Sequence, residues 1–195
     1  MTSETDIRPR LAILVASTRP GRQGIAVAEW FRAEAEKHGG FDIDFIDLAE
    51  VDLPFLDEPN HPRFKKYEHD HTKAWSARIE AADAFVFVTP EYDFAMSPVL
   101  LNAFQYLASE WNYKPGAFVS YGGVSAGLRG VQMAKLVATT LKIFTLPEAV
   151  SIPFFMQFLD EDGRLHPNEV MTDSATAVLD ELAKVEAALR PLRQG

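Results

Sequence analysis

The chain has 195 residues, 47% of them hydrophobic and 24% charged, which suits one ordinary folded domain and excludes the disordered and fibrous classes. Its 19 Lys and Arg against 28 Asp and Glu give a formal net charge of -9, which disfavours nucleic acid and anionic membranes as partners. The sequence has no cysteine, so disulfides, thiolate catalysis and cysteine-ligated metal clusters are excluded.

The first residues, MTSETDIRPR, lack the apolar core of a secretory signal. No apolar stretch approaches the roughly 20 residues that span a bilayer. We therefore expect a cytoplasmic protein with an N-terminal extension at 1–10 and one domain at 11–195.

The first half of the chain alternates strand and helix patterns. The unbroken apolar run 11–16 predicts a strand covered on both faces, and helical spacing of apolar residues follows from Ile25 to Ala35. Apolar and acidic residues alternate at 41–45, which predicts an edge strand with one wet face. After the irregular, proline-containing stretch 52–66, a helix is expected with Asp70 as its cap.

The second half continues this alternation. It predicts a strand at 84–88, a helix capped by Ser97 and ending before Lys114, a strand at 117–121, a helix after Ser125, an edge strand at 144–150 and a helix at 174–192. The segment 154–167 is expected to cross back and dock the last helix.

Five strands alternating with five helices predict an α/β fold with a parallel sheet and helices on both faces. Ligands of such sheets bind at the carboxyl ends of the strands, where the strand order reverses. In the order 2-1-3-4-5, the loops after the first and third strands face each other there.

The loop after the first strand, VASTRPGRQG at 15–24, has the composition of an anion site. Ser17 and Thr18 offer hydroxyls, Arg19 and Arg22 offer charge, and the loop leads into a helix N-terminus. It matches neither the nucleoside-triphosphate loop nor the dinucleotide fingerprint, so a monophosphate suits it better. The alternative is a solvated turn whose arginines pair with surface acids.

Two further loops could hold a flat ring. TPEYDFAMSP at 89–98 offers aromatic side chains and peptide groups, and YGGVSAG at 121–127 has glycines that let backbone amides approach a ligand. By itself the first of these could equally be a structural turn.

STRPGR at 17–22, TPEY at 89–92 and YGGVSAGLR at 121–129 occur in the order and spacing of the NADPH-dependent FMN reductase family. The chain resembles these flavoproteins, which include quinone and azo-dye reductases, over about residues 11–150. The resemblance implies a flavodoxin-like three-layer sandwich with a five-stranded parallel sheet in the order 2-1-3-4-5. It also implies FMN as cofactor and NADPH or NADH as co-substrate.

The resemblance also assigns binding residues. It places the FMN phosphate on Ser17, Thr18, Arg19, Arg22, Gln23 and Gly24. It places the isoalloxazine ring against Pro90, Glu91, Tyr92, Asp93, Phe94, Tyr121, Gly122, Gly123 and Ser125. The family usually has Gly and Asn where this chain has Ala16 and Asp93. A carboxylate at position 93 leads to the hypothesis of a lower reduction potential or weaker FMN binding.

Bound flavin would carry the chemistry, so no catalytic side chain is assigned. A site used in turn by nicotinamide and by a quinone, azo dye or free flavin predicts ping-pong kinetics. Family members suggest a homodimer or homotetramer. The alternatives are a flavodoxin-like electron carrier and a flavin-free binding relative. His61, His69 and His71 are expected in a solvated helix start, with no metal.

Overall fold

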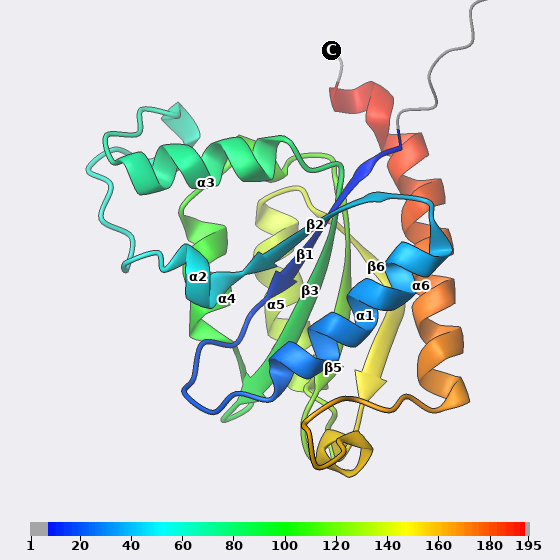
Figure 1. Ribbon diagram of the computed structural model, residues 1–195. Coiled ribbons are helices and arrows are strands. Elements are labelled where there is room, and N and C mark those ends of the chain that lie inside the picture. The colour runs from blue at the N-terminus through cyan, green and yellow to red at the C-terminus, as the bar shows by residue number, and fades with distance from the viewer. Residues whose placement is uncertain (1–7, 194–195) are drawn as a thin grey trace, which may run out of the picture.

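The computed structural model describes residues 8–193 and builds them around one twisted sheet (Figure 1). Five parallel strands follow the order β2-β1-β3-β5-β6, which confirms the predicted order. The strands are β1 (Arg10–Val15), β2 (Asp42–Asp47), β3 (Ala84–Tyr92), β4 (Ala95–Met96), β5 (Pro115–Tyr121) and β6 (Phe144–Ile152). Most of the predicted N-terminal extension lies outside the described residues.

The sheet has six strands rather than the predicted five, because β4 pairs antiparallel with the end of β3. Two residues join these strands, Asp93 with φ 48° and Phe94 with φ 69°. Positive φ at both positions is the mark of a type I′ hairpin turn. Asp tolerates this conformation, whereas Phe seldom adopts it, so residues 93 and 94 did not indicate a hairpin here.

Helices cover both faces of the sheet (Figure 1). The helices α1 (Gly24–His38) and α6 (Glu169–Leu189) pack on one face, and α3 (Asp70–Glu80), α4 (Pro98–Gln105) and α5 (Leu128–Thr140) pack on the other. Alternate residues of β1 supply the two cores: Leu11 and Ile13 face α1, and Ala12 and Leu14 face the opposite layer. The short helical turns are α2 (Leu48–Val51), η1 (Pro62–Phe64), η2 (Ser109–Trp111), η3 (Phe155–Phe158) and η4 (Arg190–Arg193).

Two helix boundaries in the middle of the chain differ from the prediction. The N-cap of α3 is His69 rather than Asp70, and α4 ends at Gln105, well before Lys114. Lys114 is buried, and its Nζ donates to the carbonyls of Ile79 at 2.8 Å and Glu80 at 3.0 Å. This side chain therefore satisfies the C-terminal carbonyls of α3, a long-range role that local helix signals do not carry.

The last helix also begins earlier than expected. Asn168 caps α6, and its side-chain oxygen accepts a hydrogen bond from the Met171 backbone at 2.9 Å. Good capping by Asn and a first-turn acid, Glu169, explain why the helix starts here rather than at Ser174.

The edge strand β2 has no simple wet face, contrary to the prediction from its alternating residues. Asp44 is 8% exposed and its carboxylate binds Arg78 at 2.7 Å and Arg10 at 3.1 Å. Phe45, predicted to be buried, is half-buried under the Arg32 guanidinium, 4.9 Å from its ring centroid. Arginines from neighbouring elements thus let an acidic residue point inward.

The strands β3, β5 and β6 run to the lower side of Figure 1, and the loops that follow β1, β3 and β5 meet there. This meeting point is called the carboxyl edge below. Within residues 8–193 no helix has the length and apolar character to cross a bilayer.

Candidate functional site

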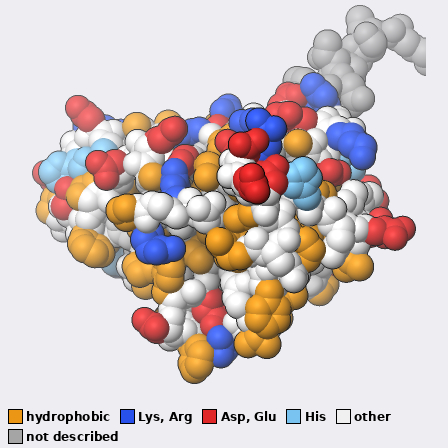
Figure 2. All heavy atoms as spheres, turned by 60° about the horizontal axis from the view of Figure 1, so that its bottom comes forward, with side chains coloured by type: hydrophobic (Ala, Val, Ile, Leu, Met, Phe, Trp, Pro, Cys, Tyr) orange, Lys and Arg blue, Asp and Glu red, His pale blue; other side chains and the backbone are white. Residues whose placement is uncertain are grey.

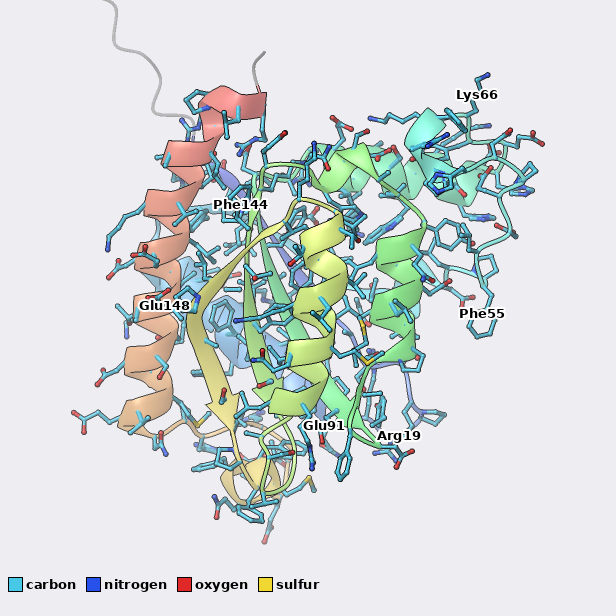
Figure 3. The ribbon with its side chains drawn as sticks, turned by 180° about the vertical axis from the view of Figure 1, so that it is seen from behind. Arg19, Phe55, Lys66, Glu91, Phe144 and Glu148 are labelled. Atoms are coloured by element: carbon cyan, nitrogen blue, oxygen red, sulfur yellow. The ribbon has the colours of Figure 1, made fainter. Side chains whose placement is uncertain are left out.

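A cleft of about 440 Å³ opens at the carboxyl edge. Figure 3 shows Arg19 and Glu91 at this end of the molecule and Phe144 at the opposite end. The cleft is lined by Ser17, Arg19, Gly21, Arg22, Gln23, Gly24, Pro90, Glu91, Tyr92, Tyr121, Gly122, Phe155 and Met156. Ten of these were predicted as cofactor-binding residues, so the three motifs do come together in one site.

The loop after β1 presents free backbone donors to the cleft. A hydrogen bond from the Arg22 amide to the Arg19 carbonyl closes a turn at 3.0 Å, with Gly21 at φ 71°. Beyond the turn, the N–H groups of Gln23, Gly24 and Ile25 meet no acceptor among residues 8–193. Such a helix N-terminus favours an anion through its unpaired amides and its dipole.

The two arginines of this loop have different roles. Arg22 pairs with Asp47 in a two-pronged contact, and it also donates to the Ser17 carbonyl. Asp47 is 6% exposed; burial alone would raise its pKa, but Arg22 and the Ala49 amide hold the pKa below its usual value. Arg19 is exposed and its guanidinium meets no carboxylate among the described residues. The free positive charge of the loop is therefore that of Arg19.

Three residues with hydroxyl groups line the cleft: Ser17, Tyr92 and Tyr121. The Ser17 and Tyr92 oxygens are 3.3 Å apart. The Tyr121 oxygen is buried and has no hydrogen-bond partner within residues 8–193. It lies against Gly24, where an added Cβ would stand 1.8 Å from the phenol oxygen. Gly24 is therefore required by close packing of helix α1 on this tyrosine.

On the other side of the cleft, Glu91 ties two loops together. Its carboxylate accepts from the Arg129 side chain at 2.6 Å, the Arg129 amide at 2.9 Å and the Gly130 amide at 3.3 Å. It also accepts from the Ser125 hydroxyl at 3.3 Å. Burial would raise the pKa of Glu91, but Arg129 and these amides outweigh it and lower the pKa. The carboxylate thus caps helix α5 and is not free for a ligand.

The hairpin that follows β3 projects away from the cleft. Asp93 and Phe94 are exposed at its tip and do not line the cleft, although both were predicted to contact the cofactor. The Arg129 guanidinium lies 3.6 Å from the Phe94 ring centroid. This contact and the Glu91 pair hold the hairpin against the start of α5.

Three more predicted residues lie off the cleft. Thr18 lines a separate cavity of about 280 Å³ beside α2 and α4. Gly123 is exposed and accepts backbone hydrogen bonds from Phe154 and Ala126. The Ser125 hydroxyl is engaged by Glu91 and by Arg129 at 2.9 Å.

Phe155 and Met156 line the cleft and were missed by the sequence analysis. The Phe155 ring lies 4.9 Å from the Tyr121 ring in an edge-on contact, and its amide donates to the Gly122 carbonyl at 3.3 Å. Both residues belong to a short apolar run that follows β6, and this run was the signal in the sequence that could have placed them at the carboxyl edge. The same segment also packs Phe158 and Leu165 on the core shared with α6, as expected.

His61, His69 and His71, in the long loop and at the start of α3, each contact neighbouring residues of the protein. His71 Nε2 lies 3.0 Å from the Asp57 carboxylate, and the His69 and His71 rings stack at 5.2 Å. His61 accepts from the Arg63 amide as the N-cap of η1. Across residues 8–193 no group of His, Asp or Glu is arranged to hold a metal ion.

Hydrophobic side chains surround the mouth of the cleft. Figure 2, which turns the carboxyl edge forward, shows hydrophobic side chains over much of this face with acidic and basic side chains between them. Met156, which lines the cleft, is exposed, and so are Val124, Leu128 and Phe154 on the segments that follow β5 and β6. A flat ligand that leaves one face open would find apolar contacts here.

Comparison with known proteins agrees with this geometry. The family model described as NADPH-dependent FMN reductase matches residues 9–157. An NAD(P)H-dependent FMN reductase of Schizosaccharomyces pombe is 36% identical over 150 residues, covering 72% of this chain and 75% of that protein. An NAD(P)H:quinone oxidoreductase of Solanum tuberosum is 28% identical over 145 residues, covering 70% of this chain and 69% of that protein.

The fold is similar to that of solved flavoproteins. The flavoenzyme NAD(P)H:(acceptor) oxidoreductase FerB of Paracoccus denitrificans superimposes with a TM-score of 0.72 at 20% identity, covering 92% of this chain and 98% of that one. A flavodoxin of Streptococcus pneumoniae gives a TM-score of 0.56 at 14% identity, covering 90% of this chain and 98% of that one. These likenesses confirm the flavodoxin-like architecture.

Proposed function

Because the chain belongs to the NADPH-dependent FMN reductase family, we propose that its carboxyl-edge cleft binds FMN and that electrons pass from NAD(P)H through it to a quinone, azo dye or free flavin. The protein is an oxidoreductase, and FMN and NAD(P)H are the cofactor and co-substrate of its family. The identity of the acceptor and the order of the two half-reactions are part of the proposal.

The observation that carries the proposal is the asymmetry of the cleft. One end combines free amides at the start of α1, the unpaired Arg19 and the orphaned Tyr121 hydroxyl, all of which suit a phosphate. The other end combines Pro90, Tyr92 and Gly122 with Phe155, which suit a flat ring. The residues present therefore fit FMN.

When bound, FMN supplies the hydride-accepting and electron-donating chemistry. The side chains of this protein hold and orient it. We propose that Arg19, Gln23 and the α1 amides hold the phosphate, while Arg22, through Asp47, fixes the shape of the loop. Glu91 is fully engaged with α5, so it keeps the β3 and β5 loops at a fixed separation. No side chain is assigned as acid or base.

One open ring face used by two substrates in turn predicts ping-pong kinetics. The test is an absorption spectrum with added FMN, followed by anaerobic NADPH and then a quinone. Flavin bands that bleach with NADPH and return with quinone are expected. Bound flavin that NADPH does not bleach would favour an electron carrier, and the absence of flavin binding would favour a flavin-free relative.

The long loop supports the proposal of a homodimer or homotetramer. Phe55 is 85% exposed, although its neighbours are fixed: the Pro54 carbonyl accepts from Asn102 at 2.7 Å, and the Leu56 amide donates to Asn102 at 3.1 Å. A rigidly held, exposed aromatic side chain is typical of a contact surface. Sedimentation of the wild type and Phe55→Ser tests this. A wild type that stays monomeric at all concentrations would end the proposal.

A further inference from the structure

The Tyr121 hydroxyl stands out among the polar atoms of the cleft. Its oxygen has no hydrogen-bond partner within residues 8–193, although the residue is only 4% exposed. Buried hydroxyls of native proteins usually have a hydrogen-bond partner. Within residues 8–193 eight buried side-chain polar atoms lack one, and Tyr121 is the residue among them that lines the cleft. The cleft is the place from which a ligand could supply the missing acceptor, because Tyr121 is one of its lining residues.

The position of the hydroxyl identifies the end of the cleft that it serves. An added Cβ on Gly24 would lie 1.8 Å from the phenol oxygen and 2.5 Å from Cζ, so the hydroxyl is directly under the first residue of α1. The free amides of Gln23 and Gly24 belong to the same helix start. The ring of Tyr121, by contrast, packs edge-on against Phe155 at 4.9 Å.

The hydroxyl is available as a donor. Burial raises the pKa of the Tyr121 phenol, and the neighbouring Ser17 hydroxyl and the charges of Arg22 and Arg19 offset only part of the rise. The Ser17 hydroxyl is within hydrogen-bond distance of Tyr92, 3.3 Å away, and not of Tyr121. The phenol therefore keeps its proton at neutral pH. Its surroundings contain the positive charges of Arg19 and Arg22. An anionic acceptor is the ligand group that satisfies both the proton and these charges.

We propose that the Tyr121 hydroxyl donates a hydrogen bond to the phosphate of bound FMN, so that this residue recognises the phosphate and not the isoalloxazine ring. The proposal rests on the proposed function. It reassigns a residue that the sequence resemblance places against the ring. It also gives the site a means of discriminating FMN from riboflavin, which carries the same ring without the phosphate.

The experiment compares Tyr121→Phe with the wild type in titrations of FMN and of riboflavin, followed by quenching of flavin fluorescence. Loss of a hydrogen bond to a charged group is expected to weaken FMN binding about tenfold or more. Riboflavin binding is expected to stay unchanged. The control is Tyr113→Phe, because Tyr113 lies beside Phe144 at the opposite end of the sheet.

Equal weakening for both flavins, or no weakening for either, would overturn the assignment to the phosphate. The apo form of Tyr121→Phe should melt at the same temperature as the wild type or higher, since the change removes an unsatisfied hydroxyl and keeps the ring. A marked fall in the melting temperature would show that the hydroxyl stabilises the folded apo protein, which would contradict the proposal.

A second measurement uses the wild type. In protein labelled with ¹³C at tyrosine Cζ, the Tyr121 signal, identified by its loss in Tyr121→Phe, should move on addition of FMN and stay in place with riboflavin. A wild type that binds neither flavin would contradict the proposed function itself. A wild type that binds both, with an unmoved Tyr121 signal, would contradict only the role of Tyr121.

Discussion

The two sides of the cleft treat charge in opposite ways. On the side of helix α5, Glu91 and Arg129 are paired with each other and with backbone amides. On the side of helix α1, Arg22 is paired with Asp47, but Arg19, the first amides of the helix and the Tyr121 hydroxyl stay unpaired. Among these groups, those left free to pair with an external anion therefore lie on the α1 side.

This difference separates residues that shape the site from residues that bind its ligand. Side chains already paired within the protein contribute to the stability of the apo form, whereas unpaired groups contribute only when a ligand arrives. Each of the following substitutions tests one side of this division.

Arg22→Ala should lower the free energy of unfolding of the apo protein by about 3 kcal/mol, because it leaves the Asp47 carboxylate buried without its partner. Urea denaturation measures the change. Asp47→Asn in the same chain is the control, and the double variant should lose less than the sum of the two single variants. A fully additive result would show that the pair is not coupled.

Glu91→Gln should cost about 2 kcal/mol of unfolding free energy, since it removes the charged partner of Arg129 and of the α5 amides. Burial raises the pKa of Glu91 in the folded protein, but Arg129 and the α5 amides outweigh burial and hold the pKa below the ordinary value of 4.5. Its contribution is therefore complete above about pH 4.5 and is lost as the pH falls through the lower folded value.

The stability gap between wild type and Glu91→Gln should accordingly be constant at neutral pH and close under acid conditions. Thermal unfolding at a series of pH values measures it. Ser125→Ala is the matched control, because it removes one contact of the same carboxylate but keeps the charge. A gap that grows on acidification would contradict the role of Glu91 as an ionised cap.

Arg19→Gln should weaken FMN binding about tenfold, which corresponds to about 1.4 kcal/mol, without changing the stability of the apo protein. It should also reduce the dependence of FMN affinity on salt, because a charge on the exposed loop is lost. Fluorescence titration at two salt concentrations measures both effects. Riboflavin affinity should not change, and a parallel loss for riboflavin would place Arg19 away from the phosphate.

Asp93→Asn should have the smallest effect, because the residue lies at the exposed hairpin tip and does not line the cleft. The φ of 48° suits Asp and Asn alike, so stability should change by no more than about 0.5 kcal/mol. The hypothesis that this carboxylate lowers the flavin potential or affinity is tested by measuring both in the variant. Unchanged values would end it.

Local signals explain why so much of the fold was predictable. Apolar runs identified the central strands, glycines marked the end of α1 at Gly39, and Ser97 with Pro98 marked the start of α4. These signals act over a few residues, so tertiary packing did not override them. The predicted helix boundaries that depend on distant partners, such as the C-terminal end of α4, were wrong.

The site was predictable in composition but not in the roles of its side chains. Sequence alone determined that three loops with glycines, hydroxyls and arginines gather at the carboxyl edge, because parallel strands bring their ends together. Whether an arginine is free or paired depends on residues far along the chain. Arg22 meets Asp47, 25 residues away, and Glu91 meets Arg129, 38 residues away.

The lining residues that were not predicted have the same explanation. Phe155 reaches the cleft because β6 lies beside β5, which puts the segment after β6 over Gly122. The orphaned hydroxyl of Tyr121 likewise appears only when α1 packs over β5 at Gly24. The residue patterns thus indicated the alternation of strands and helices and the residues that gather at the sheet edge, and the family resemblance supplied the strand order. The tertiary structure decided which of those residues remain unpaired, because hydrogen-bond partners are chosen by proximity in space and not along the chain.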